Sequence, residues 1–177
     1  MNRRKAIGSM VLGSAAAAAA PLAMAAEKGI ESIMTRFAAA KVFTMLVADA
    51  MPADAYDFKP KPEMRGFGEL MVHIGQGQVF YVARLSKTAV PDSLKAPKPI
   101  DKDNAKKYLA DTFDFCATTL AAQTMADLDK SYAGRPNTPS LSGWDIVLNA
   151  FIHTSHHRGY ADVYLREKNL TPPTYSV

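Results

Sequence analysis

The sequence predicts an all-α protein, a four-helix bundle in which long crossover connections join some of the helices. Four segments repeat apolar residues with the period of a helix over roughly twenty residues or more. Between them, no segment shows the alternating, β-branched pattern of a strand. Four helices of this length in one domain pack as a bundle.

The helix boundaries follow from prolines and from residues that cap helix ends. The helices are expected over residues 30–51, 66–86, 101–123 and 142–169. Asp101 is expected to cap the third helix, and either Ser140 or Ser142 the fourth. The connections at 52–65 and 87–100 contain several prolines, which favour extended backbone. Both are longer than neighbouring helices need, so at least one is expected to cross the bundle.

Residues 1–25 have the layout of a secretory signal peptide. A short basic segment precedes an uncharged stretch rich in Ala and Gly, and Ala23-Met24-Ala25 suits a signal peptidase. The stretch has too few large apolar residues for a stable membrane anchor. Arg3-Arg4 leaves two export routes open, the twin-arginine route and the general secretory route. The mature chain, residues 26–177, is expected to be a single domain, periplasmic or secreted.

Removing the signal peptide changes the charge of the chain. The whole sequence has 21 Lys and Arg against 17 Asp and Glu, a formal net charge of +4. Three of the basic residues lie in the signal peptide, so the mature chain keeps 18 against 17, a net charge of +1. No nucleic-acid partner is therefore expected. Cys116 is the only cysteine, which excludes an internal disulfide, and we expect a buried, inert thiol.

Three of the four histidines lie within five residues of one predicted helix. His153 and His157 are four residues apart, so they point the same way, about 6 Å apart, and suit one metal ion. His73 lies on the second helix, and packing its face against the fourth helix would bring a third imidazole to that ion. His156 points away from His157, toward the surface or behind the ligands. At each position, a histidine packed in the core remains the alternative.

The residues around the histidines narrow the chemistry. The segment from His153 to His157 has the ligand spacing of HExxH, but Thr154 replaces the glutamate that activates water. A zinc protease is therefore not expected. Carboxylate-bridged di-iron bundles need Glu-x-x-His on two helices. Here Glu69 lies four residues before His73, and the pair has no second copy.

Two stretches resemble the DinB/YfiT-like family of metal-binding four-helix bundles. Residues 56–73, which begin Tyr-Asp-Phe-Lys-Pro and end at His73, are similar to the family's entry into its second helix. The segment His153-Thr-Ser-His-His-Arg-Gly159 resembles the family's HxxxHRG signature, and residues 164–173 resemble its tail. The resemblance covers nearly all of the mature chain. One departure is Tyr160, where many members have Gln, and this bears on the substrate class.

The resemblance implies a ligand set, an ion and a type of reaction. The ligands fall on His73, His153 and His157, and the ion is a divalent metal such as nickel, zinc or iron. A crossover topology and a homodimer are also implied. The family's activities are mostly transfers or isomerisations assisted by small thiols, since an open metal position binds a thiol and lowers its pKa. The small-molecule partner would be a thiol or an electrophile.

Three functions remain open at this point. The first is a metal-dependent enzyme of the thiol-dependent transferase type, whose substrate is unknown. The second is a metal-dependent hydrolase, for which Glu69, one turn before His73, is the candidate base. The third is a metal-binding or stress-associated bundle without catalysis.

Overall fold

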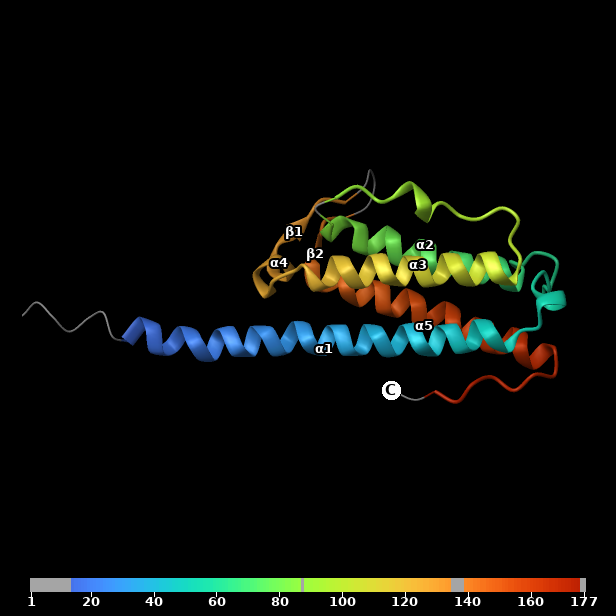
Figure 1. Cartoon of the computed structure of the whole chain (residues 1–177), viewed down its shortest axis with the longest axis horizontal. Coiled ribbons are helices and arrows are strands. Elements are labelled where there is room, and N and C mark those ends of the chain that lie inside the picture. Colours follow the sequence, from blue (N-terminus) through green and yellow to red (C-terminus); the bar gives the residue numbers. More distant parts are fainter. Residues whose placement is uncertain (1–13, 87, 135–138, 176–177) are drawn as a thin grey trace, which may run out of the picture.

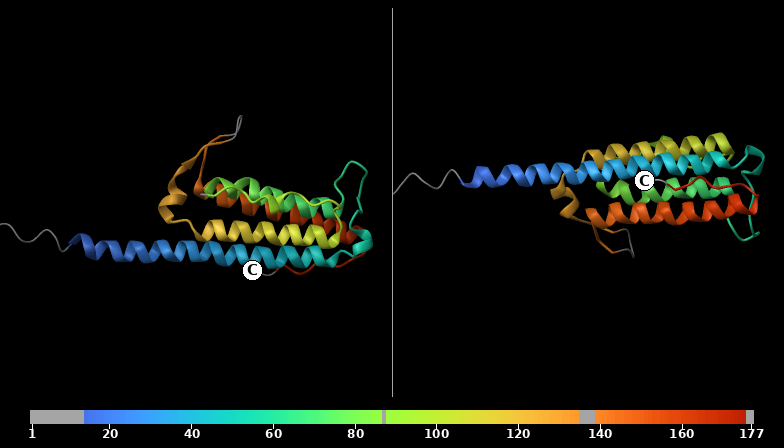
Figure 2. Two further views of the ribbon diagram at one scale, coloured as in Figure 1. Left: turned by 45° about the horizontal axis from the view of Figure 1, so that its top comes forward. Right: turned by 90° about the horizontal axis from the view of Figure 1, so that it is seen from below.

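Four long helices lie along one axis (Figures 1 and 2). The computed structural model describes residues 14–86, 88–134 and 139–175, and the side chains among them from residue 29 on. The long helices are α1 (Ser14–Ala50), α2 (Phe67–Val82), α3 (Lys102–Ala121) and α5 (Gly143–Glu167). The prediction of an all-α four-helix bundle is confirmed.

Short elements lie between the long helices. Three 3₁₀ turns occupy the first two connections: η1 (Ala53–Ala55), η2 (Ala83–Leu85) and η3 (Asp92–Leu94). A short helix, α4 (Met125–Asp129), and an antiparallel pair of strands, β1 (Ser131–Tyr132) and β2 (Leu141–Ser142), connect α3 to α5. The sequence predicted neither α4 nor the strands, because elements of this length are too short to show a period.

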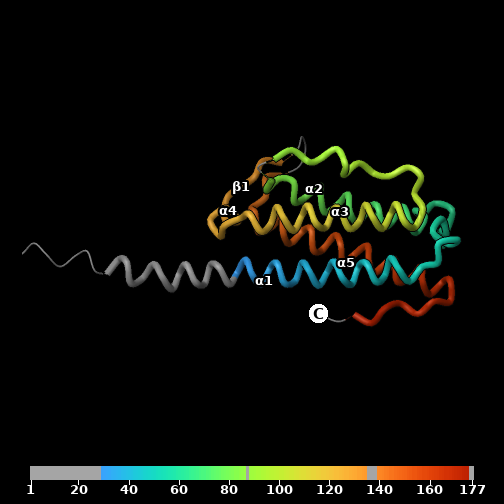
Figure 3. Tube along the Cα trace, in the orientation of Figure 1, coloured from blue at the N-terminus to red at the C-terminus, as the bar shows by residue number. Residues whose placement is uncertain are grey.

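One connection crosses the whole bundle (Figure 1). α2 runs antiparallel to α1, and residues 83–101 then return along the length of the bundle before α3 begins. α3 therefore runs parallel to α2, and α5 runs parallel to α1, as the trace in Figure 3 shows. α2 packs mainly against α3 and α5, and α1 packs against the same two helices. The expected crossover is confirmed, and it places α2 and α5 side by side.

The helix ends follow local chemistry. Asp101 caps α3 as predicted. Ser142, rather than Ser140, caps α5: its hydroxyl accepts the Asp145 N–H at 3.1 Å, and the Asp145 carboxylate accepts the Ser142 N–H at 3.2 Å. α5 ends two residues before Asn169, whose φ of 57° breaks the helix in the left-handed region. α2 also ends earlier than predicted, because its last turn tightens into η2.

α1 begins at Ser14, well before the predicted start near residue 30. Residues 1–13 of the expected signal peptide, including Arg3-Arg4, lie outside the described residues. The packing of α1 on the bundle is described from Gly29, which lies against Met125 of α4. Within the described part of the chain, no helix is both long enough and apolar enough to cross a membrane.

The core lies where the four helices meet, and it is mainly apolar and aromatic. Its largest fully buried side chains include Tyr164, Phe67, Phe113, Met51 and Met71. Cys116 is fully buried, as predicted, and burial raises the pKa of its thiol. One buried polar pair joins α2 and α5, since Gln78 Nε2 on α2 donates to Thr154 Oγ1 on α5 at 3.2 Å.

Candidate metal centre

Two helices bring three histidines together. His73 lies on α2, and His153 and His157 lie one turn apart on α5. One ring nitrogen from each histidine lies within 4.8 Å of the other two. Elsewhere in the described residues, no three His, Cys or carboxylate side chains converge in this way. The alignment that the sequence left open, between His73 and the pair on α5, is thus present in the fold.

The spacing of the nitrogens suits a metal ion. His73 Nε2 lies 3.2 Å from His157 Nε2, and the ring centroids of His153 and His157 are 4.5 Å apart. Two nitrogens that each lie about 2.0–2.1 Å from a tetrahedral zinc ion are separated by about 3.3 Å. Without an ion, the same distance suits a hydrogen bond in which one imidazole N–H donates to the other ring. The distance between these two nitrogens is therefore compatible with either arrangement.

Gly77 makes room for the ring of His153. A Cβ at Gly77 would lie 1.9 Å from Cε1 of His153 and 2.3 Å from its Nδ1. Any other residue at this position on α2 would displace the ring. The missing side chain at Gly77 therefore lets α2 lie close to the His153 ring.

Two ring nitrogens in the site have no protein partner. Nδ1 of His153 and Nδ1 of His157 are buried, and no group in the described chain forms a hydrogen bond with either. A metal-bound histidine usually donates its second ring N–H to a carboxylate or a carbonyl. Among the described residues, no hydrogen bond to Nδ1 fixes the tautomer of the His153 ring or of the His157 ring. Each neutral ring keeps a nitrogen lone pair for an ion.

Burial and neighbouring positive charges favour the neutral form of all three imidazoles. Burial is the largest cause that lowers the pKa of His73, and it also lowers the pKa of His153 and of His157 to about 4. The neighbouring histidines and Arg65 act in the same direction, since positive charges oppose one another. Metal binds the neutral ring, so the ligands are ready at pH 7 without releasing protons.

A cavity of about 560 Å³ opens beside the histidines. This volume falls within the range of small-molecule sites, roughly 300–1,000 Å³. Its wall comes from α2 and the turn after it, from the crossover connection and from α3 and α5: His73, Gln76, Gly77, Val79, Phe80, Tyr81, Ala83, Val90, Leu94, Ala96, Tyr108 and His153. The wall combines apolar side chains with the polar groups of two histidines, two tyrosines and Gln76, and none of these described residues is a carboxylate.

The other residues singled out in the sequence lie at the edge of the site. His156 is exposed, and its ring contacts Tyr160 at a centroid distance of 4.7 Å. It is absent from the convergent group, as expected for a residue at the surface. Tyr160 is 45 % exposed and lies 5.9 Å from His157, and it does not line the 560 Å³ cavity.

Glu69 belongs neither to the histidine cluster nor to the cavity wall. Its Oε2 accepts the backbone N–H of Gly66 at 2.7 Å and lies 3.6 Å from Lys59 Nζ. The backbone hydrogen bond is the first cause that lowers the pKa of this exposed carboxyl, and Lys59 adds to it. Glu69 therefore caps the start of α2 and is not placed to act as a base at the cavity.

Sequence reasoning missed most of the cavity wall. Gly77 and Tyr81 lie four and eight residues after His73, a spacing that places all three on one helix face. This part of the cavity wall can therefore be predicted from the sequence. The crossover residues Val90 and Leu94 carried no comparable signal. Their stretch has no helical or strand period, and its place over α2 depends on the topology.

Comparison with known proteins identifies the family and supports the fold. The family model of the DinB superfamily matches residues 38–161, a span that contains all three histidines. A DinB-like protein from Bacillus cereus ATCC 10987 is 17% identical, with a TM-score of 0.70 over 82% of this chain and 97% of that one. A DinB-like protein from Bacillus subtilis is 22% identical, with a TM-score of 0.65 over 81% and 96%. A search of curated proteins gives no match.

Proposed function

This chain belongs to the DinB superfamily, and from that premise we propose that it binds one divalent metal ion through His73, His153 and His157. The observation that carries the proposal is the convergence of the three imidazoles, two of which, those of His73 and His153, also line a cavity. Imidazole ligands suit nickel, zinc and iron, so the donor set admits all three ions.

We propose further that the protein is a metal-dependent enzyme of the thiol-dependent transferase type. Three histidines leave a coordination position open, and a bound ion would supply the charge that lowers the pKa of a thiol. The chain itself supplies the apolar wall. Tyr81 and Tyr108 line the space next to His73, where they would exclude water and hold the apolar part of an electrophile.

The same wall argues against hydrolysis. Activating water at a metal usually calls for a nearby base. The described residues that line the cavity include no Asp or Glu, and Glu69 is engaged at the start of α2. The family resemblance and the chemistry of the wall therefore favour a thiol over water as the nucleophile.

Cobalt(II) replacing the native ion offers a direct test, because a thiolate bound to cobalt absorbs in the near ultraviolet. We expect glutathione to produce this band in the cobalt protein, and to do so below the pH at which the free thiol ionises. His156→Ala should behave like the native protein, and His153→Ala should lose the band. Tight cobalt binding with no thiolate band would leave a non-catalytic metal-binding protein.

We also propose that the mature protein works outside the cytoplasm. The layout of residues 1–25 supports export, and Arg3-Arg4 admits the twin-arginine route, which would let the chain fold with its metal beforehand. Changing both arginines to lysine should block export by this route. Unimpaired export of the variant would assign the chain to the general secretory route.

We propose a homodimer, as the family resemblance implies. Support comes from the outer face of α5, where Ile152 and Val163 are 54 % and 47 % exposed. Gly159 lies between them on the same face, and a Cβ there would meet nothing within 4 Å. Exposed apolar residues around a small residue suit a second copy of the helix.

A further inference from the structure

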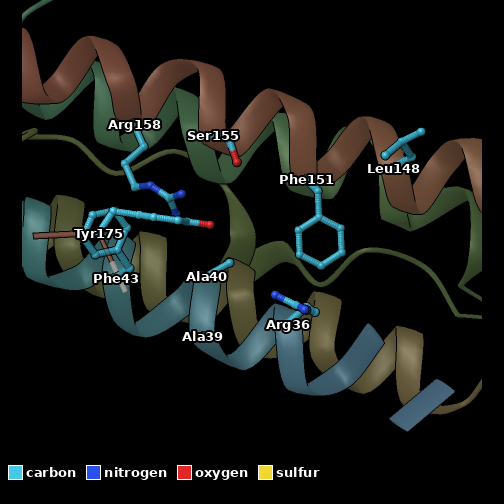
Figure 4. Close-up of a pocket in the computed structure, with 9 residues that line it drawn as sticks. All are labelled: Arg36, Ala39, Ala40, Phe43, Leu148, Phe151, Ser155, Arg158 and Tyr175. Atoms are coloured by element: carbon cyan, nitrogen blue, oxygen red, sulfur yellow. The ribbon is translucent and has the colours of Figure 1, made fainter. Parts of the chain in front are cut away.

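A second cavity lies between α1 and α5, away from the histidines (Figure 4). Its volume is about 240 Å³. Nine residues line it: Arg36, Ala39, Ala40, Phe43, Leu148, Phe151, Ser155, Arg158 and Tyr175. None of them lines the cavity beside the histidines. His153 and His157 lie on the side of α5 that faces α2, so the two cavities are on different faces of the same helix.

Arg158 brings a buried positive charge to this cavity. Its side chain is only 7 % exposed, and Figure 4 shows the guanidinium reaching from α5 toward α1. The guanidinium carbon lies 4.5 Å from the ring centre of Phe43 and 5.7 Å from that of Tyr175. Stacking on aromatic faces stabilises the cation and leaves the N–H groups at its edge free to donate.

The protein provides few acceptors for those N–H groups. In the described chain, one hydrogen bond of Arg158 is formed, from Nη1 to Thr44 Oγ1 at 3.3 Å, whereas a guanidinium has five donors. That hydroxyl itself donates to the Ala40 carbonyl at 2.7 Å. Among the described residues, no carboxylate reaches ion-pair distance of Arg158, although Asp162 follows it by one turn. Buried charges are ordinarily paired.

The rest of the cavity is apolar and small. Phe43 is buried, and Ala40 and Phe151 are half-buried, so together with Ala39 they form an apolar floor. Exposed residues, Leu148 and Ser155 among them, form the rim. A water-sized group takes about 30 Å³, so the cavity has room for roughly eight such groups. This is enough for a carboxylate with a short alkyl or aryl chain, and too little for a long lipid.

We propose that the cavity between α1 and α5 binds a small amphipathic carboxylate, whose anionic head pairs with Arg158 and whose short apolar chain lies against Phe43 and Phe151. A planar carboxylate matches two parallel N–H groups of a guanidinium. Arg36 at the rim adds a second positive charge to the same opening. The site is independent of the metal centre, because it uses neither the histidines nor their cavity.

Calorimetric titration of the metal-free, full-length protein with hexanoate tests this proposal. Hexanol has the same chain without the charge, and inorganic phosphate has the charge without the chain. We expect hexanoate to bind roughly ten- to hundredfold more tightly than hexanol, the usual effect of a hydrogen bond to a charged group. Phosphate alone should bind more weakly than hexanoate. Equal affinity for hexanoate and hexanol, or for hexanoate and phosphate, would overturn the proposal.

Variants locate the site. Arg158→Met should weaken hexanoate binding to the level of hexanol, whereas Arg166→Met, an exposed arginine on the same helix, should not. Ser155→Phe fills the opening while keeping the arginine, so it should abolish binding even if Arg158→Met fails to fold. The double variant His153→Ala, His157→Ala should bind hexanoate normally. Undiminished binding by Ser155→Phe, or loss of binding in the histidine variant, would place the ligand elsewhere.

Discussion

At the scale of single residues, the proposed metal centre depends on one residue that is not among the three histidines. Gly77 carries no side chain, and this absence lets the His153 ring approach α2. His73 and the pair on α5 were evident in the sequence from their type and spacing. The role of Gly77 was not, because it follows from the distance between two helices. Sequence spacing gives the direction of a side chain but not the depth to which helices pack.

Gly77→Ala should separate metal binding from helix stability. Alanine favours the helix by roughly 0.5–1 kcal/mol over glycine, but its methyl group would displace His153. We expect metal affinity to fall by roughly tenfold or more, as when ligand orientation is lost, with helical content unchanged. Gly159→Ala is the control on α5, since its Cβ meets no atom within 4 Å. Equal metal affinity of both variants would refute the role of Gly77.

The buried imidazoles should make the metal-free protein sensitive to acid. The folded pKa of His153 and of His157 is about 4, below the ordinary value of 6.5, so the unfolded chain binds protons first as the pH falls. Above pH 6.5 the two histidines have no effect. Between pH 6.5 and about 4, we expect them to lower the free energy of unfolding progressively.

Urea unfolding at several pH values measures this dependence. The double variant His153→Gln, His157→Gln removes both groups and leaves the carboxylates, which also titrate in this range. Its stability should fall less steeply with pH than that of the native chain. Parallel curves would show that the histidines are not protonated differently in the two states.

At the scale of elements, α5 contributes most to the proposed sites. It carries two of the three clustered histidines, the arginine of the second cavity and the exposed apolar face. Its start was predicted to within two residues, because a serine cap leaves a clear signal. The ends of α2 and α5 were harder to place. α2 ends in a 3₁₀ turn after Val82, and α5 ends before Asn169, which has a left-handed backbone conformation. Many sequences can adopt either conformation, so neither helix end is evident from the sequence.

Removing the α5 cap should reveal which serine acts. Ser142→Ala loses the hydroxyl that accepts the Asp145 N–H, and we expect it to lower the free energy of unfolding by about 1 kcal/mol. Ser140→Ala, at the exposed alternative position, should change it by less than about 0.5 kcal/mol. Urea unfolding of the two variants makes the comparison. A larger loss in Ser140→Ala would contradict the assigned cap.

At the scale of the whole molecule, the sequence predicted the bundle and a crossing connection, but it did not identify which connection crosses. Both candidate connections are proline-rich and of similar length. The choice of 83–101 depends on which helix faces pack together. Because residues 83–101 form the crossover connection, Val90 and Leu94 lie at the cavity beside the histidines. The part of the cavity wall that comes from the crossover connection could therefore not be predicted from the sequence, whereas the histidine cluster could.

The proposed dimer predicts a response confined to the outer face of α5. Val163→Glu would bury a charge in a contact between two copies, so we expect light scattering to report a monomer. Thr118→Glu adds the same charge to an exposed position on α3 and should leave the mass unchanged. A native chain that is already monomeric at high concentration would contradict the dimer.

A divalent ion held by three histidines can be detected by measuring the metal content of the purified mature protein by mass spectrometry. We expect about one ion per chain, lost in the double variant His153→Ala, His157→Ala and retained in His156→Ala. If no ion is found even after incubation with nickel, zinc and iron(II), the histidines are packed core residues and the metal centre does not exist.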